Sequence, residues 1–347
     1  MKTRKLALLL TAILVICLVF SGCERKTRED SGAAVGGGGG GNPNKKVVDI
    51  YGGEECKIAY IAHDLGTPNN QGWKEGIERE CASWPNIKID SYGAEEKADK
   101  QVEIMTNCIN QQYNAIIIQC SDGAALAPSV AQAEEAGIPV ITLNLDCSSD
   151  TVHSALVMAV DYDAGRMAAD GMAKQIGEKG KIAIIEGVPG LERTDNLERG
   201  FIDTVKEKYP NIEIVAQQSA AFQKDKARQI MESFMQQHGD LAGVFAINDA
   251  MAEGAALAAN NRGKKGQISI WGADGEKIAL EMIEEGSMAG TIYTNSWDEG
   301  STAAKIALLM ISSDYDSAIL TKTPKVIMEP IVVTKETVKD ISEEDRW

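Results

Sequence analysis

Short apolar runs, each followed by a polar turn and then by helix-forming sequence, recur along this chain and constrain its fold most strongly. The clearest example is the run 243–247, which is followed by Asn248 and Asp249 and then by the Ala-rich segment 250–257. A run this short and apolar is typical of a strand that is buried on both faces. Because Ala-rich sequence favours helix, the segment predicts a strand, a tight polar turn and a helix.

The polar turn of this unit is a candidate binding position. In an open parallel sheet, ligands bind outside the carboxyl ends of the strands. Asn248 offers a donor and an acceptor, and ionised Asp249 offers acceptors, so the pair could hold neighbouring hydroxyls of a polyol. The alternative is that one of the two residues only caps the following helix.

The same pattern occurs in two successive sets. In the first set we expect strands at 57–62, 86–92, 115–118, 139–143 and 157–160, with helices at 73–83, 99–111 and 126–136. In the second set we expect strands at 181–185, 212–215, 243–247, 268–271 and 290–295, with helices at 165–176, 197–209, 225–238 and 277–285. Strands that alternate with helices in this way form parallel βαβ units, so the chain is predicted to be an α/β protein of two lobes with a cleft between them.

The N-terminus has the pattern of an export signal. Basic residues precede the apolar run 6–20, and Ser21, Gly22 and Cys23 follow it. This end resembles the lipobox of bacterial lipoproteins, in which Cys23 would carry the lipid, although Phe20 stands where that pattern prefers Leu. A transmembrane anchor is the alternative, but the run is shorter than the ~20 residues that a spanning helix needs. The Gly-rich segment 23–46 predicts a flexible tether.

Composition and cysteine spacing argue against several functions. The net charge is −16 and basic residues are not clustered, so nucleic acid is not an expected partner. No Ser-His-Asp arrangement, metal-ligand spacing or nucleotide loop is evident, which predicts a non-enzyme without cofactor or metal. Apart from Cys17 and Cys23, five cysteines remain, so at least one is unpaired or pairs between molecules. A bridge between Cys120 and Cys147 is one alternative, and buried free thiols are favoured.

Three segments, 136–143, 244–255 and 271–275, carry a resemblance to a known family. In this order and spacing, from Cys56 to about Lys335, the chain resembles the ribose-type (type I) periplasmic substrate-binding proteins of ABC importers. The resemblance implies two similar doubly wound parallel-sheet lobes joined by a three-crossing hinge, with crossings near Asp161, near Asn295 and at 327–329. The implied division is a signal peptide at 1–22, the tether at 23–46, an N-terminal lobe of 47–161 plus 295–327, and a C-terminal lobe of 162–294 plus 328–347.

The resemblance also implies a set of ligand-binding residues at the strand ends. Amide and carboxylate groups that would bind ring hydroxyls are Gln119, Asn144, Asn248 and Asp274, with Thr294 or Asn295 at the last strand. Phe222 stands where an aromatic ring packs on a sugar. Asn69 and Asn70 occupy the places of two family aromatics, and Arg193 is the residue nearest to a family Arg.

Further candidates and alternatives accompany this set. His63, Asp195 and Trp297 are additional candidate contacts. Phe222 could instead be core, and Arg193 could form a surface ion pair of small energetic value. Trp73 and Trp271 are expected to be core residues. Because Ala273 and Leu145 replace a family aromatic and a family Arg, we expect a more polar or larger ligand than ribose.

The function that the resemblance implies is capture of a solute outside the cytoplasm. A membrane-anchored lipoprotein would bind a sugar or related polyol by hinge closure and deliver it to the permease subunits of an ABC importer, as a monomer. A nucleoside or a signalling furanose is the alternative ligand, and a chemoreceptor partner is an alternative role. A repressor of the same fold is disfavoured, since it would need a basic DNA-binding head where this chain has an export signal.

Overall fold

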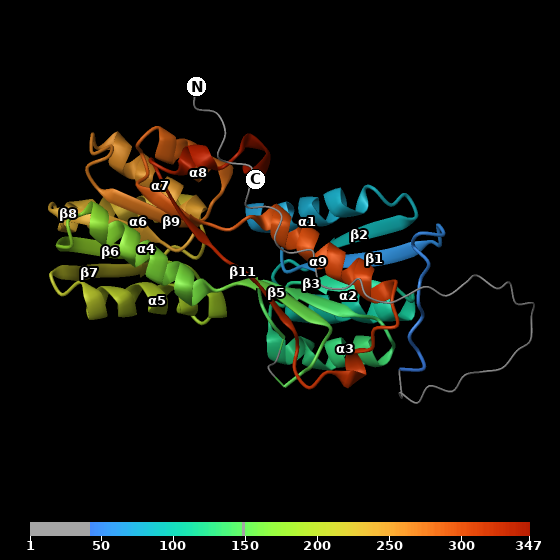
Figure 1. Ribbon diagram of the computed structural model, residues 1–347. Helices are drawn as coiled ribbons and strands as arrows, with labels where there is room; N and C mark the ends of the chain where they lie inside the picture. Colours follow the sequence, from blue (N-terminus) through green and yellow to red (C-terminus); the bar gives the residue numbers. More distant parts are fainter. Residues whose placement is uncertain (1–41, 148–149) are drawn as a thin grey trace, which may run out of the picture. The chain divides into compact units, whose positions relative to one another are not determined.

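Two six-stranded sheets organise the part of the chain that the structure describes, which comprises residues 42–147 and 150–347 of a computed structural model (Figure 1). We call them the first and the second sheet. The predicted signal peptide, the lipidation site Cys23 and most of the predicted tether lie outside the described residues.

The first sheet is parallel throughout and has the order β11-β5-β4-β3-β1-β2. Its strands are β1 (Cys56–Ala62), β2 (Ile87–Gly93), β3 (Ala115–Ile118), β4 (Val140–Leu143), β5 (Ala155–Ala159) and β11 (Lys325–Met328). Its helices are α1 (Pro68–Cys81), α2 (Ala98–Asn110), α3 (Gly123–Glu135) and α9 (Ser296–Ile311).

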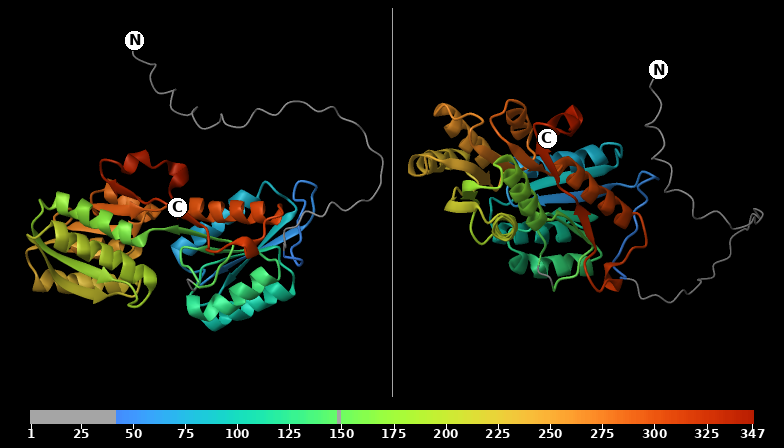
Figure 2. Two further views of the ribbon diagram at one scale, coloured as in Figure 1. Left: turned by 60° about the horizontal axis from the view of Figure 1, so that its bottom comes forward. Right: turned by 60° about the vertical axis from the view of Figure 1, so that its left-hand side comes forward.

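Helices cover both faces of this sheet (Figure 2). Successive side chains of a strand point to opposite faces. Ile58 and Tyr60 therefore share one apolar cluster with residues of α1 and α9, whereas Ala59 and Ile61 share another with residues of α2 and α3. This two-sided burial is why the strands read as unbroken apolar runs rather than as alternating patterns.

The second sheet has the order β12-β10-β9-β8-β6-β7, in which β12 is antiparallel to β10. Its strands are β6 (Gly180–Glu186), β7 (Ile212–Ser219), β8 (Leu241–Ala246), β9 (Ser269–Asp274), β10 (Gly290–Tyr293) and β12 (Ile331–Thr334). Its helices are α4 (Asp161–Gln175), α5 (Glu192–Lys208), α6 (Lys224–Gln237), α7 (Asp249–Asn261) and α8 (Lys277–Glu284). The core includes the fully buried Trp271 and the stacked rings of Phe201 and Phe245, whose centroids are 4.5 Å apart.

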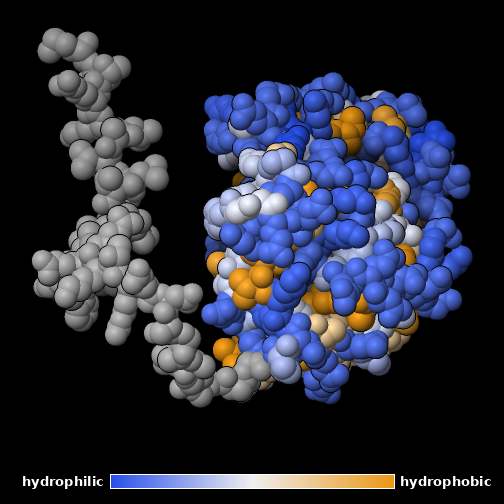
Figure 3. Space-filling model, turned by 90° about the vertical axis from the view of Figure 1, so that its right-hand side faces the viewer, coloured by the Kyte–Doolittle hydropathy of each residue, from blue (hydrophilic) through white to orange (hydrophobic). Residues whose placement is uncertain are grey.

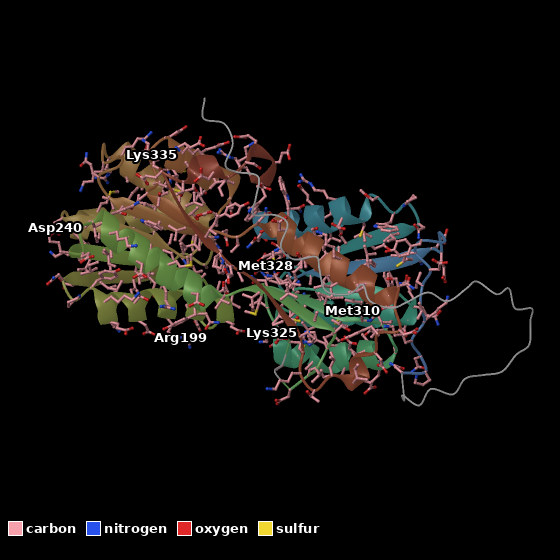
Figure 4. All side chains as sticks on the ribbon, in the orientation of Figure 1. Arg199, Asp240, Met310, Lys325, Met328 and Lys335 are labelled. Atoms are coloured by element: carbon pink, nitrogen blue, oxygen red, sulfur yellow. The ribbon has the colours of Figure 1, made fainter. Side chains whose placement is uncertain are left out.

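The chain passes between the two sheets three times. It leaves the first sheet after β5 and enters α4 at Asp161, and it returns between β10 and α9 at Thr294 and Asn295. The third passage joins β11 to β12 and follows Met328, which is labelled in Figure 4. The predicted fold class is confirmed. The precise lobe boundaries stay a prediction.

Three helices begin four or five residues earlier than the sequence pattern indicates, and these predicted starts were wrong. Helix α4, expected from residue 165, begins at Asp161. Helix α1 begins at Pro68, a residue whose fixed φ suits the first helical position, so Asn69 and Asn70 lie in its first turn and not in a loop. Helix α5 begins at Glu192, so Arg193 and Asp195 are also helical. The first turns of α1 and α5 consist mainly of polar residues. An amphipathic pattern is visible only where apolar residues recur, so it did not indicate these helix starts.

The five cysteines of the described residues are buried and free, which confirms the favoured prediction. Burial raises the pKa of Cys147 to about 12.

Within residues 42–147 and 150–347, no helix has the length and apolar character that a membrane crossing requires. The face seen in Figure 3 is mostly hydrophilic, with apolar side chains scattered over it, as expected for the exterior of a globular protein.

Candidate functional site

Polar side chains follow the carboxyl ends of neighbouring strands in both sheets. In the first sheet, His63, Gln119 and Asn144 follow β1, β3 and β4. In the second sheet, Phe222, Asn248 and Thr294 follow β7, β8 and β10, and Asp274 ends β9. Because the strands are adjacent and parallel in each set, each sheet presents these groups along one edge.

A chain of hydrogen bonds connects the two edges. Asn69 of α1 donates from Nδ2 to Asp274 Oδ1 over 3.4 Å. Arg193 of α5 donates to the same Asp274 oxygen and, through its other terminal nitrogen, to Asp161 Oδ1 over 3.3 Å. Ser296, at the start of α9, donates to Asn69 Oδ1. Four elements from both sheets therefore meet at Asn69, Asp161, Arg193 and Asp274.

The charges of this network are mostly withdrawn from water. Asp161 and Asp274 are 6% and 5% exposed. Burial raises the pKa of Asp161 to about 6, although Arg193 opposes the shift. Burial also raises the pKa of Asp274 against the effect of Arg193. Burial would lower the pKa of Arg193, but Asp274, Asp161 and Glu299 raise it overall, so the guanidinium stays charged.

Several strand-end residues have backbone conformations that L-residues seldom adopt. The φ angles of Asn144, Phe222 and Asp274 are +65°, +60° and +123°. Asn tolerates the left-handed region, whereas +60° is strained for Phe, and the +123° of Asp274 lies outside the region that Asp tolerates. Strain of this kind persists where surrounding contacts hold it and is frequent at functional sites. The three residues thus mark both sheet edges as candidate binding surfaces.

Asn248 and Asp249 have separate roles. Asn248 accepts from Met251 N over 2.9 Å and caps α7, which leaves its amide Nδ2 to donate. Asp249 is fully buried, and its carboxylate accepts from Gly275 N, Glu276 N and the Thr291 hydroxyl. The idea that this pair holds neighbouring hydroxyls was wrong for Asp249, because its acceptors are used to fix the turn after Asp274.

The contact between the Asp249 carboxylate and strand β9 requires a glycine at position 272. A Cβ on Gly272 of β9 would lie 2.1 Å from Asp249 Oδ1, a distance that no real contact reaches. The carboxylate therefore sits directly against the backbone of the strand that ends in Asp274. It positions Asp274 but does not itself face a guest.

Gln119 and Asn144 supply neutral groups at the first edge. Gln119 is 7% exposed, and its Oε1 has no hydrogen-bond partner among the described residues. Its backbone nitrogen donates to Ile61 O, which fixes the residue beside the end of β1. Asn144 is 4% exposed and is anchored by its backbone nitrogen, which donates to Val157 O over 2.7 Å. A buried amide oxygen without a partner is costly, so a donor from a guest would relieve Gln119.

Phe222 is partly buried at the second edge. A Cβ on Gly187, just after β6, would lie 2.6 Å from Phe222 Cζ and 2.6 Å from Thr194 Oγ1. The ring therefore lies over Gly187 beside the Thr194 hydroxyl, which is buried without a hydrogen-bond partner in the described residues. Phe222 also packs against the core, so the two interpretations of this ring are compatible.

Other predicted contacts are engaged within the protein. Asn70 is 1% exposed; its side chain accepts from Tyr60 and donates to Thr67, and it also pairs with His63 Nδ1. Burial lowers the pKa of this His63, so the ring is neutral near pH 7. With these partners Asn70 and His63 fix the loop after β1, so we propose neither as a ligand contact.

The remaining predicted contacts are similarly occupied. Thr294 donates its hydroxyl to Asp274 O, and Asn295 caps α9 by accepting from Asp298 N. Asp195 is exposed and accepts from Gly190 N. Arg79 lies 3.7 Å from the ring centroid of Trp297, which places this ring on the α1–α9 pair. Trp73 is buried, as expected, and donates to Glu299.

Sequence reasoning missed four residues of this region. Asp161, Ser296 and Glu299 are buried and polar, and Thr194 is buried beside Phe222. One signal was available for Glu299, because it shares the buried stripe of α9 with Ala303 and Ala307 at intervals of four residues. A charged residue on such a stripe indicates a specific role.

One cluster outside this region has metal-ligand chemistry. Asp146, Cys147 and His153 place ligand atoms within 4.8 Å of one another. Asp146 lies 3.5 Å from His153 Nε2, whereas Cys147 Sγ lies 3.4 Å from Nδ1. Since the two nitrogens of one imidazole point in different directions, this arrangement does not converge on one ion. Thr142 and Thr151 also bond the ring, so the cluster is better explained as an anchor of the β4–β5 loop.

Comparison with known proteins gives a consistent result. A family model described as "Periplasmic binding protein domain" matches residues 58–314. The ribose import binding protein of Bacillus subtilis is 33% identical over 69% of this chain and 76% of its own length. The xylitol-binding protein of Mycolicibacterium smegmatis is 30% identical over 81% of this chain and 78% of its own length.

Solved structures also resemble this chain. A periplasmic solute-binding protein of an ABC transporter from Actinobacillus succinogenes, solved with bound D-allose, superposes with a TM-score of 0.75 at 28% identity. The match covers 82% of this chain and all of that chain.

Proposed function

Because this chain belongs to the family of periplasmic binding protein domains, we propose that it captures a sugar or related polyol outside the cytoplasm and delivers it to an ABC importer. The family consists of transport solute-binding proteins. The observation that carries the proposal for this chain is the bonded series Asn69, Asp274, Arg193 and Asp161, which brings groups from both sheets to one place.

The chemistry of the two edges suits a guest with many hydroxyls. Each hydroxyl both donates and accepts. Gln119 Oε1 and the carboxylates of Asp161 and Asp274 accept, while Arg193 and the free amide of Asn248 donate. Phe222 offers an aromatic face to the C–H surface of a ring. The guests named for the relatives, ribose, xylitol and D-allose, are all uncharged and hydroxylated, which supports this ligand class.

Capture proceeds by hinge closure in this proposal. The lobes are 47–161 with 295–327 and 162–294 with 328–347, and the three passages between the sheets act as the hinge. A guest shifts the open and closed populations only by the difference in its affinity for the two. Hydrogen bonds to both edges form only when the edges approach, so a guest that bonds to both stabilises the closed form, which the permease subunits recognise.

We further propose that Cys23 carries a lipid that anchors the protein to the outer side of the membrane. The motif Ser21, Gly22 and Cys23 after the apolar run supports this. Labelling of expressing cells with an alkyne fatty acid should mark the wild-type chain and not Cys23→Ala. Equal labelling of the two would remove the anchor from the proposal and leave the ligand untouched.

A thermal-shift screen of the purified full-length chain tests the ligand class. The panel contains neutral sugars, sugar alcohols, inositols and nucleosides. A guest at 100 times its Kd should stabilise the fold by about 2.7 kcal/mol. We expect one hydroxylated class to raise the melting temperature of the wild type and to leave that of Asp274→Ala unchanged. No shift with any member at millimolar concentration would contradict the proposal.

A further inference from the structure

The network between the two edges contains more negative than positive groups. Asp161, Asp274 and Glu299 are 6%, 5% and 2% exposed. Arg193 bonds to the first two, and all three carboxylates act on its pKa. One guanidinium can offset one carboxylate, so the group formed by these four residues has a formal charge of −2.

Glu299 is the one of these three carboxylates to which Arg193 does not hydrogen-bond, and it supplies one of the two unbalanced negative charges. It lies in the first turn of α9, and its Oε2 accepts from Trp73 Nε1 over 2.6 Å. Its Oε1 is buried and has no hydrogen-bond partner among the described residues. A buried carboxylate oxygen without a donor is expensive. The structure therefore holds an acceptor that a donor from elsewhere would satisfy.

The groups that surround Glu299 come from several elements. Trp73 of α1 bonds to it directly, and Arg193 of α5, Asp161 of α4 and Asp274 of β9 act on it through their charges. Burial raises the pKa of Glu299 to about 7, and Arg193 and Trp73 oppose the shift. At pH 8 its carboxylate is therefore predominantly ionised, as is that of Asp161, whose pKa is about 6.

We propose that this excess of buried carboxylate makes the site selective by charge, so that it excludes acidic sugars and prefers a hydroxylated guest with a protonated amine over its neutral counterpart. Glu299 is the specificity-determining residue. The inference rests on the proposed function, since it concerns the same site. A carboxylate on a guest would face like charges in a site of low dielectric, which weakens its binding, whereas an ammonium group offsets them and donates hydrogen bonds.

A simpler role for Glu299 is to satisfy the indole of Trp73 and nothing more. In that role the charge of Glu299 has no effect on the choice of guest. Glu299→Gln separates the two roles, because the amide oxygen still accepts from Trp73 Nε1 while the charge is removed. Glu253→Gln, a matched change of a carboxylate that pairs with Lys224 near the surface, serves as the control.

The test is calorimetric titration of the full-length chain at pH 8 with matched guests. Each set shares one skeleton in three forms, such as galactose, 6-amino-6-deoxygalactose and galacturonate or the glucose equivalents, chosen by the neutral sugar that binds. The primary amine at C6 stays protonated at pH 8 and occupies the same position as the carboxylate of the acid. A single like charge should weaken the acid at least about tenfold relative to the neutral sugar. The amine should bind more tightly than the neutral sugar. Glu299→Gln should shrink both ratios, and Glu253→Gln should leave them as in the wild type.

Three outcomes would overturn the inference. These are an acid that binds within threefold of the neutral sugar, an amine that binds more weakly than the neutral sugar, and ratios that Glu299→Gln leaves unchanged while the protein stays folded. Each leaves the proposed function standing, because the neutral sugar still binds. Absence of binding by every neutral sugar and polyol would instead contradict the proposed function.

Discussion

The two sheets end in different chemistry. The edge of the first sheet presents neutral amides, Asn69, Gln119 and Asn144, whereas the edge of the second presents Arg193 and Asp274 with Asp161 beside them. Within the described residues, the amides of the first edge form no hydrogen bonds to one another, whereas the charged groups of the second edge are held by one another. Loss of one charged residue should therefore disturb its partners, while loss of an amide should act locally.

The largest effect is expected at the charged edge. Asp274→Ala removes a carboxylate that bonds to Arg193 and Asn69. A hydrogen bond from the guest to a charged group contributes about 1.5–3 kcal/mol, so the Kd for the guest should rise by roughly 10- to 100-fold. Isothermal titration calorimetry measures this change in Kd. Asp240→Ala is the control, because Asp240 pairs with Lys181 at an exposed position of the same sheet (Figure 4). An equal rise in Kd in Asp274→Ala and Asp240→Ala would contradict a specific role of the charged edge in binding.

A tenfold effect is expected from Asn248→Asp. The new carboxylate keeps the oxygen that caps α7 but loses the amide donor, so the Kd should rise about tenfold with little change in melting temperature. Asn248→Ala also loses the cap and should cost about 1 kcal/mol of stability in addition. Equal affinity in the wild type and Asn248→Asp would remove Asn248 from the site.

A smaller effect is expected at the neutral edge, where two adjacent residues can be compared. Asn69→Ala should raise the Kd about fivefold, the effect of one neutral hydrogen bond. Asn70→Ala should leave the Kd unchanged and lower the melting temperature, since Asn70 bonds to Tyr60 and Thr67 inside the protein. Thermal melts and titrations on the same samples distinguish the two. A loss of affinity in Asn70→Ala alone would reverse our assignment.

The smallest effect concerns stability at the charged edge. Burial, followed by Asp249 and Asp274, raises the pKa of Glu276 to about 9. Because the folded pKa lies above the unfolded one, this group's contribution is complete below about pH 4.5 and is lost as the pH rises towards 9. Glu276→Gln should therefore be more stable than the wild type at pH 8, by about 1 kcal/mol, and not at pH 4.5. Denaturant unfolding at both pH values measures the difference. A Glu276→Gln chain that is less stable at pH 8 would contradict it.

Strand and helix order could be predicted from the sequence, because buried parallel strands appear as isolated apolar runs. The starts of α1 and α5 could not be predicted, because their first turns are polar. The sequence therefore did not show that Asn69 and Arg193 lie on helices. The hydrogen-bond partners of the buried aspartates could not be predicted from the sequence either. Nothing in the sequence shows that Asp249 accepts hydrogen bonds from Gly275 and Thr291, whereas Asp274 accepts from Arg193. Which strand-end residues contact a guest therefore stays a prediction.

A crystal structure with a bound hydroxylated guest tests the account most directly. It should show hydroxyls of the guest within hydrogen-bonding distance of Asn69 or Gln119 on one side and of Asp274 or Arg193 on the other. A guest that contacts residues of only one sheet, or that binds away from both edges, would contradict the central claim.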